Sequence, residues 1–124
     1  MKVKNIKISI KTTEVFLEEA KSTMKKIAAG EKVSMKKGLY FENLKAMRNA
    51  LTPKRLELLH AIKENHPQSV YQLSGLMNRD LKNVTQDLTF LERLDLVELK
   101  KSKDTKSKTT PSVEYDKILV EIAV

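Results

Sequence analysis

The sequence predicts an α+β fold, with helices in the middle of the chain and β-strands towards both ends. Between residues 52 and 94, apolar residues recur at three- and four-residue steps, the spacing of helices that bury one face. Isoleucines alternate with polar residues in the first eleven positions, and apolar residues alternate again in the last twelve. Alternation with many β-branched residues is typical of half-buried strands.

The composition limits the function classes that the chain fits. With 124 residues it forms one domain, or one domain with an appendage, and without Cys it has neither disulfides nor thiolate metal sites. It contains no glycine-rich phosphate loop, metal-ligand spacing or nucleophile–base arrangement, so we expect no enzyme and no cofactor. Because the chain has no membrane-spanning apolar run and no signal-peptide core, we expect a cytoplasmic protein without a membrane partner.

The positive charge is concentrated in two places. The formal net charge of +8 fits binding to a polyanion, although net charge alone indicates only non-specific binding. Residues 1–38 contain ten Lys and four acidic residues, and residues 98–111 contain five Lys and two acidic residues. The second segment is the more informative because of its position, as described below.

The N-terminal part of the chain predicts one strand followed by one helix. Thr12 or Thr13 can cap the helix, and Gly30 is a natural stop. A unit of two elements cannot bury both apolar faces alone, so it should pack on the rest of the chain or on a second copy. We therefore predict a dimerisation extension at residues 1–38 and a second domain at 39–124. The apolar residues at helical spacing are Phe16, Ala20, Met24 and Ile27.

Two helices are predicted next, after the polar and basic connector 31–38. The first is short, and the second begins at the Thr52-Pro53 pair, where Thr caps and the missing N–H of Pro costs nothing. The second helix continues to about Asn65. The apolar residues that mark the two helices are Phe41, Leu44, Met47, Leu51, Leu56, Leu59 and Ile62.

Two further helices joined by a tight turn follow between Ser69 and Val97. Ser69 and Gln72 have the spacing of a capping box, so a helix should begin at Val70. The turn falls at residues 77–79, because Asn78 tolerates the left-handed conformation that a sharp turn needs. The residues expected to be buried are Val70, Leu73, Leu76, Leu81, Val84, Leu88, Leu91 and Leu94.

A helix pair of this kind is how a helix-turn-helix presents side chains to DNA. Donor-rich side chains gather near the start of the second helix, and such side chains read base edges in the major groove. The alternative is an ordinary solvated helix face. We predict that the helix at about 80–94 lies in the major groove and that the DNA-binding residues there are Arg79, Lys82, Asn83, Thr85 and Gln86.

A basic loop between two strands follows that helix. Residues 96–99 and 113–124 indicate strands, with a possible break in register at Asp116-Lys117, and residues 100–111 join them. Two strands and a basic loop in this position have the layout of a wing, whose lysines add affinity by contacting phosphates. The predicted wing contacts are Lys101, Lys103, Lys106 and Lys108.

The order helix, helix, helix, strand, loop, strand resembles a winged helix-turn-helix, and its motifs resemble those of MarR-like regulators of archaea and bacteria. The patterns are LT-x-x-R-x-x-LL, P-x-S-x-x-x-L, R-D-x-x-x-V-x-x-D-L-x-x-L and P-x-V-x-Y-D. The resemblance covers about residues 41–124 and, more loosely, the N-terminal extension. The matching residues are Leu51, Thr52, Arg55, Leu58, Leu59, Pro67, Ser69, Leu73, Arg79, Asp80, Val84, Asp87, Leu88, Leu91, Pro111, Val113, Tyr115 and Asp116.

The resemblance implies a DNA-binding transcriptional regulator that is a dimer and uses no cofactor. Two positions depart from the family. Where Asp95 stands the family often has Gly, so the turn into the wing is expected to be tighter or more strained. Where Gln86 stands relatives often have Arg, so an operator preference does not transfer.

Two functions are therefore expected. The first is sequence-specific regulation of transcription by a homodimer on double-stranded DNA. The second is an antitoxin-like or protein-interaction winged helix that neutralises a partner protein and regulates its own operon. The second is motivated by Phe90, which lies on the polar side of its helix, although packing of Phe90 against a neighbouring helix or strand is the favoured interpretation. Asp87 is expected to pair with Arg79 or with the supporting helix.

Overall fold

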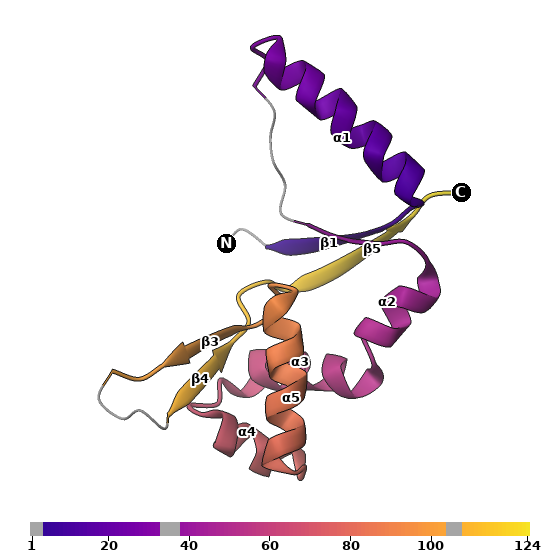
Figure 1. Ribbon diagram of the computed structural model, residues 1–124. Helices are drawn as coiled ribbons and strands as arrows, with labels where there is room; N and C mark the ends of the chain where they lie inside the picture. Colours follow the sequence, from indigo (N-terminus) through magenta and orange to yellow (C-terminus); the bar gives the residue numbers. More distant parts are fainter. Residues whose placement is uncertain (1–3, 33–37, 104–107) are drawn as a thin grey trace. The chain divides into compact units, whose positions relative to one another are not determined.

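The computed structural model describes residues 4–32, 38–103 and 108–124 and divides into two units (Figure 1). The first unit is Met1–Ala50 together with Tyr115–Val124, and the second is Leu51–Glu114. The described residues form five helices and five strands, so the predicted α+β class is confirmed. The division differs from the boundary predicted between residues 38 and 39, because the last strand joins a sheet of the first unit.

The first unit contains a parallel three-stranded sheet in the order β2-β1-β5. The predicted N-terminal strand is therefore confirmed, as β1 in the middle of the sheet. Ile8 lies opposite Leu39 of β2 on one side and Val120 of β5 on the other. Ile8 and Ile10 are buried, as their alternation predicts. The bounds of the strands are β1 Asn5–Ile10, β2 Gly38–Phe41 and β5 Lys117–Ile122.

Helix α1 (Thr13–Ala28) follows β1 and has the start and stop predicted for it. The side chain of Thr12 accepts a hydrogen bond from the first turn, and Gly30 has a left-handed φ of 81°. Phe16 stacks on Tyr40 of β2 with ring centroids 4.5 Å apart. None of the α1 residues, all of which the structure describes, is buried. The large apolar residues exposed on α1 are Val15, Phe16, Leu17, Met24 and Ile27.

Strand β2 was not predicted. The sequence placed the start of a short helix near Phe41, but Phe41 is the last residue of β2, and helix α2 runs from Leu44 to Ala50. The four residues of β2 are too few to show alternation. The helix begins where Asn43 Oδ1 accepts a hydrogen bond from Ala46 N at 2.8 Å.

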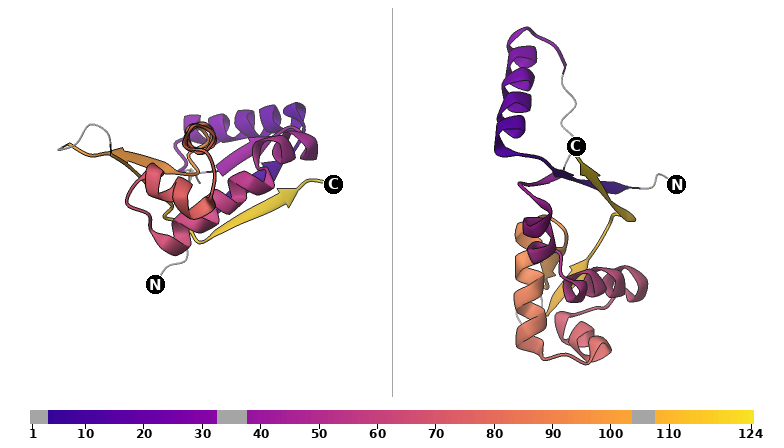
Figure 2. Two further views of the ribbon diagram at one scale, coloured as in Figure 1. Left: turned by 90° about the horizontal axis from the view of Figure 1, so that it is seen from below. Right: turned by 90° about the vertical axis from the view of Figure 1, so that its right-hand side faces the viewer.

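The second unit contains three helices and an antiparallel hairpin of β3 and β4 (Figures 1 and 2). The helices begin after Thr52, Ser69 and Asp80, whose side chains each accept a hydrogen bond from a backbone N–H of the first turn. The bounds are α3 Pro53–Asn65, α4 Val70–Met77, α5 Leu81–Arg93, β3 Glu98–Lys101 and β4 Thr109–Ser112. The large side chains almost completely buried in this unit are Leu58, Ile62, Leu73, Val84, Leu88, Leu91 and Leu96.

Two residues on either side of the α4–α5 turn are more exposed than predicted. Leu76 is 54% exposed and Leu81 is 43% exposed, although both continue an apolar stripe. The left-handed Asn78, with φ 51°, ends the eight-residue α4 one residue after Met77 and redirects the chain. A helical stripe therefore does not continue through the turn, and the two leucines remain at its surface.

The sequence predicts the wrong partner for the second strand of the wing. The sequence pairs residues 113–124 with 96–99, but β4, whose first three residues lie in the predicted basic loop, pairs with β3 and places Leu99 opposite Pro111. Residues 117–122 instead form β5, which runs parallel to β1. The physical reason is that alternation identifies a strand without specifying its neighbour. The predicted break at Asp116-Lys117 lies where β5 begins.

Candidate functional site

The turn between α4 and α5 fixes the start of α5 by local hydrogen bonds. Ser69 Oγ accepts from Gln72 N at 2.9 Å, which confirms the predicted cap, while Gln72 Oε1 accepts from Gln68 N at 2.7 Å. Asn78 adopts the predicted left-handed conformation. Asp80 then accepts a hydrogen bond from Asn83 N at 3.3 Å and begins α5. Both helix starts are therefore set by residues close to them in the sequence.

Helix α5 has one buried face and one exposed polar face. Val84, Leu88 and Leu91 are buried, whereas Lys82 and Asn83 are exposed and Gln86 is on the same outward side. Lys82 and Gln86 are four residues apart and therefore lie on the same side of the helix. The fold thus brings together three of the predicted DNA-binding residues on the first two turns of α5. We call Lys82, Asn83 and Gln86 the α5 polar face.

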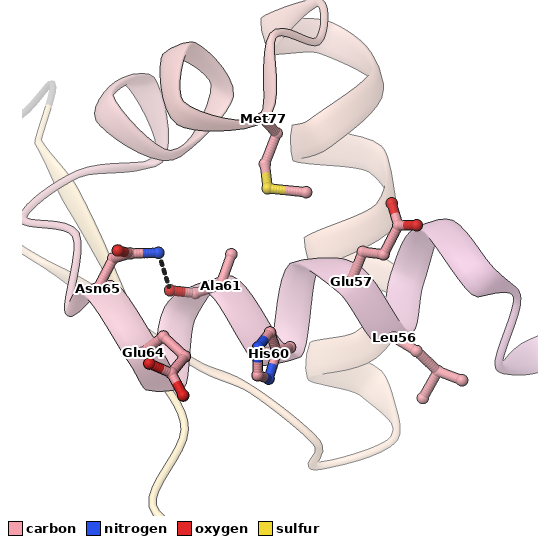
Figure 3. A pocket seen from close by; sticks show the side chains of 7 residues that line it. All are labelled: Leu56, Glu57, His60, Ala61, Glu64, Asn65 and Met77. Atoms are coloured by element: carbon pink, nitrogen blue, oxygen red, sulfur yellow. Dashed lines mark hydrogen bonds between the residues drawn. The ribbon is translucent and has the colours of Figure 1, made fainter.

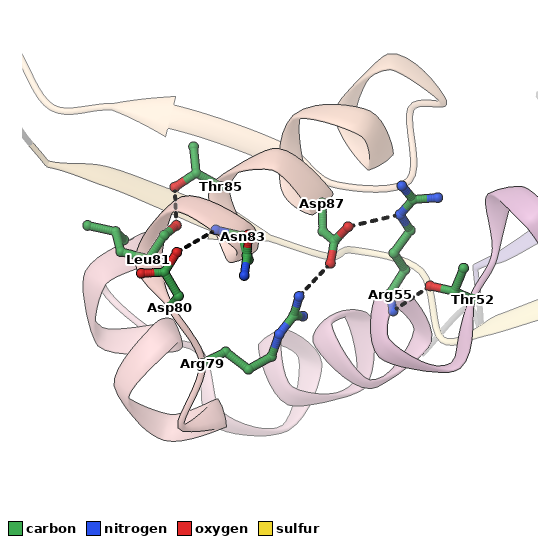
Figure 4. A network of polar contacts seen from close by, with 8 residues as sticks. All are labelled: Thr52, Arg55, Arg79, Asp80, Leu81, Asn83, Thr85 and Asp87. Atoms are coloured by element: carbon green, nitrogen blue, oxygen red, sulfur yellow. Dashed lines mark hydrogen bonds and ion pairs between the residues drawn. The ribbon is translucent and has the colours of Figure 1, made fainter.

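Thr85 is also exposed, but its hydroxyl already has a hydrogen-bond acceptor. Thr85 Oγ1 donates to Leu81 O at 2.8 Å within the helix (Figure 4). Its methyl group and both lone pairs of its oxygen are still available to a ligand. Thr85 therefore lies beside the α5 polar face and has one fewer donor than the sequence suggests.

Arg79 does not lie with the exposed residues. Its Nη2 is 2.8 Å from Asp87 Oδ2, and Asp87 Oδ1 is 3.1 Å from Arg55 Nε of α3 (Figure 4). The three side chains are only 18–19% exposed. Arg79 Nη1 is buried without a hydrogen-bond partner among the described residues. The two pairings expected for Asp87 are both confirmed, and they join α3, the turn and α5 into one network.

Phe90 is packed against this network. The guanidinium of Arg55 lies 3.9 Å from the centroid of the Phe90 ring, a cation–π contact, and Phe90 is half-buried. The packing alternative for Phe90 is therefore confirmed. Sequence reasoning did not identify the role of Arg55, because no local signal links it to Asp87, 32 residues later.

The β3–β4 hairpin extends away from the three helices of its unit (Figures 1 and 2), and its sequence is rich in lysine. Lys101, Lys103 and Lys108 are exposed, and the fourth predicted wing residue, Lys106, lies outside the described residues. Ser102 N donates to Lys108 O at 2.9 Å across the base of the loop. The hairpin is attached to the loop before α4, because Thr110 Oγ1 donates to Gln68 O at 2.6 Å.

The second unit also has an open pocket of about 630 Å³ along α3 (Figure 3). His60 lies between two glutamates there, and Met77 covers one side. In the part of the chain that the structure describes, no three His, Asp or Glu side chains form a group that could hold a metal ion. The pocket carries two carboxylates and is therefore a poor site for an anion. It is lined by Leu56, Glu57, His60, Ala61, Glu64, Asn65 and Met77.

The sequence of residues 50–120, which is more than half of the chain, matches the HVO_A0114 family. The chain belongs to this family. The match includes all of α3, α4, α5 and the β3–β4 hairpin, and hence the α5 polar face, and it ends within β5. No curated protein matches the chain. No described helix is both long and apolar enough to cross a membrane.

Proposed function

We propose that this protein is a sequence-specific DNA-binding regulator of transcription and that its second unit is a winged helix-turn-helix. The α5 polar face is the observation that carries the proposal, because two amides and an ammonium group lie together on a helix whose opposite face is buried. The order α3, α4, α5, β3, β4 and the motifs that resemble MarR-like regulators support the same proposal.

In this proposal α5 enters the major groove. The side-chain amides of Asn83 and Gln86 can each donate to and accept from one base, as adenine requires, and Lys82 can donate to guanine. The hairpin lysines, with Lys101 as the clearest case, contact phosphates and contribute affinity without sequence choice. Arg79 acts indirectly, because its ion pair with Asp87 holds the turn against α5.

The proposal includes a homodimer. Both α1 and β5 carry large exposed apolar residues, which include Met24 at 69% and Ile122 at 55%. Contiguous exposed apolar residues are typical of interaction surfaces. A symmetric pair of chains presents two copies of α5, and a pseudo-palindromic operator with two half-sites fits that arrangement.

The test begins with selection of bound duplexes from a random pool, which yields a preferred binding site directly. Fluorescence anisotropy then gives affinities for the selected duplex and for a scrambled duplex. Asn83→Ala should weaken binding to the selected duplex by about 1–3 kcal/mol and leave scrambled binding unchanged. Lys101→Ala should weaken both equally and reduce the salt slope by about 1. Lys25→Ala, an exposed lysine of α1, is the matched control.

Two results would contradict the proposal. One is a pool that shows no enrichment over random sequence. The other is an equal loss on both duplexes for Asn83→Ala, because that variant would then act on affinity alone. Unchanged amide NMR spectra away from the substituted residue would show that neither variant has altered the fold.

A second candidate function is a protein-interaction module that neutralises a partner protein and regulates its own operon. Phe90 no longer supports it, since that ring packs beneath Arg55. The exposed apolar side of α1 does support it. If it is right, the product of a neighbouring gene should co-purify with the protein, and the double variant Met24→Glu/Ile27→Glu should lose that product while it keeps its affinity for DNA. Retention of the product by this variant would exclude α1 as the contact.

A further inference from the structure

Strand β5 is an open apolar edge of the sheet. It pairs with β1 on one side, and no other strand in the described residues pairs with its outer side. Leu119, Val120 and Ile122 are between 46% and 55% exposed. An exposed apolar edge strand is a template for pairing with a strand of another chain.

The backbone direction of β5 shows which groups that edge offers. Ala123 N donates to Ile10 O at 3.2 Å, so the backbone N–H group of residue 123 points towards β1. Because the backbone groups of successive residues in a strand point to alternate sides, the N–H and C=O groups of Ile118, Val120 and Ile122 point to the open side. These three residues therefore offer a donor and an acceptor each, as an antiparallel partner strand requires.

We propose that the β5 strands of two copies of this chain pair antiparallel about a two-fold axis at Leu119. The two sheets then form one continuous sheet across the dimer. In this register Ile118 lies opposite Val120 of the second copy and exchanges backbone hydrogen bonds with it. Leu119 lies opposite the second Leu119, and Lys117 lies opposite the second Glu121.

Charge complementarity selects this register. The two-fold axis generates each contact twice, so one Lys117–Glu121 pair lies on each side of the central leucines. Opposite charges directly across an antiparallel pair are stabilising. An axis at Val120 would also keep the apolar faces together, but it would place Glu121 opposite Leu119 and Lys117 opposite Ala123. That register loses both ion pairs.

Glu121 has room for a second cation. Its carboxylate is 2.7 Å from Lys7 Nζ of the same chain, and its side chain is still 66% exposed. The hydrogen bond from Lys7 and then its positive charge hold the pKa of Glu121 below its ordinary value, so the group is a carboxylate at neutral pH. Lys117 of the second copy would approach it from the open side of the edge.

Cysteine cross-linking tests the register, because the chain has no cysteine of its own. Residues opposite each other in a non-hydrogen-bonded pair have Cα atoms about 4.5 Å apart, which a disulfide can join. Leu119→Cys should therefore form covalent dimers under mild oxidation. Val120→Cys is the matched control, with 46% exposure against 48%, and its two copies would lie beyond the ~7 Å limit. Equal cross-linking of the two variants, or none in either, would overturn the proposal.

A charge exchange tests the same edge by a different measurement, sedimentation equilibrium. Lys117→Glu places like charges across the edge twice and should raise the dimer dissociation constant about tenfold or more. The added change Glu121→Lys restores opposite charges and should restore the dimer. Lys21→Glu on α1 makes the same charge change away from β5 and should leave the dimer dissociation constant unchanged. A monomer at all concentrations, or a double variant as weak as the single one, would overturn the proposal.

This inference rests on the homodimer of the proposed function and not on its DNA binding. Both measurements are made without DNA. A dimer that dissociates with Met24→Glu on α1 but shows no Leu119→Cys cross-link would refute the β5 edge and leave the proposed homodimer standing. A cross-linked dimer that selects no DNA sequence would refute the proposed function and leave the β5 edge standing.

Discussion

Replacing Asp87 by Ala tests the network that joins α3 to α5. Asp87 contacts Arg79 at 2.8 Å and Arg55 at 3.1 Å, and the three side chains are at most 19% exposed. The change removes the carboxylate and leaves two like charges close together in a largely buried position. Removal of one member of a buried ion pair costs about 3–5 kcal/mol, and the remaining exposure places this case near 3 kcal/mol. The free energy of unfolding of the second unit should fall by that amount.

Two further variants calibrate this loss. Glu98→Ala breaks a pair with Lys100 in the same unit, with both side chains more than half exposed and the atoms 3.8 Å apart. Exposed pairs contribute only about 0–1 kcal/mol. Asp87→Asn keeps the shape of the side chain and one acceptor oxygen but removes the charge. Its loss in free energy of unfolding should therefore lie between those of Asp87→Ala and Glu98→Ala.

The measurement is urea unfolding followed by the amide NMR signals of Leu88 and Leu91. Those signals report on the second unit alone, which matters because two units need not unfold in one transition. The reasoning is refuted if Asp87→Ala costs no more than Glu98→Ala. Such a result would mean that solvent screens the network despite its burial.

The remaining predictions concern one ionisable group and one backbone conformation. Burial raises the pKa of Tyr115 from 10.0 to about 12. The folded protein holds the Tyr115 proton more tightly than the unfolded chain, so the contribution of this group to the free energy of unfolding is complete below pH 10 and is lost as the pH rises to 12. Absorbance at 295 nm should show that Tyr115 ionises late. The variant Tyr115→Phe should not show this fall in stability between pH 10 and 12. Asp95→Gly should stabilise the second unit by about 1 kcal/mol in urea, because Asp95 has a φ of 58° that disfavours side chains other than Gly. No gain would show that the Asp95 side chain compensates for the strain.

Local signals account for what the sequence could predict. The caps at Thr12, Thr52 and Ser69 and the turn at Asn78 were identified because each depends on residues within three positions along the chain. The polar face of α5 was predicted for the same reason, since helical spacing alone separates its two faces. The strain expected at Asp95 came from the family resemblance and not from a local pattern, and the φ of Asp95 is positive.

Long-range pairing accounts for what could not be predicted. The alternation of residues 117–122 indicates a strand, but whether it pairs with β1 or β3 depends on residues far away in the sequence. The contact of Arg55 with Asp87 has the same origin. Arg79 pairs with the other oxygen of Asp87 and therefore does not lie with the exposed residues. A donor-rich residue beside the start of a helix can therefore form a buried ion pair instead of binding a ligand.

The most direct test of the proposed function compares affinities for a selected duplex and a scrambled duplex in one variant. The variant carries Lys82→Ala, Asn83→Ala and Gln86→Ala together. Because the three residues lie on the surface of α5, the free energy of unfolding should change by only about 0.5 kcal/mol for each. We predict that the ratio of the two affinities falls close to one while binding to the scrambled duplex is largely kept. A ratio as high as that of the unaltered protein would contradict the proposed function.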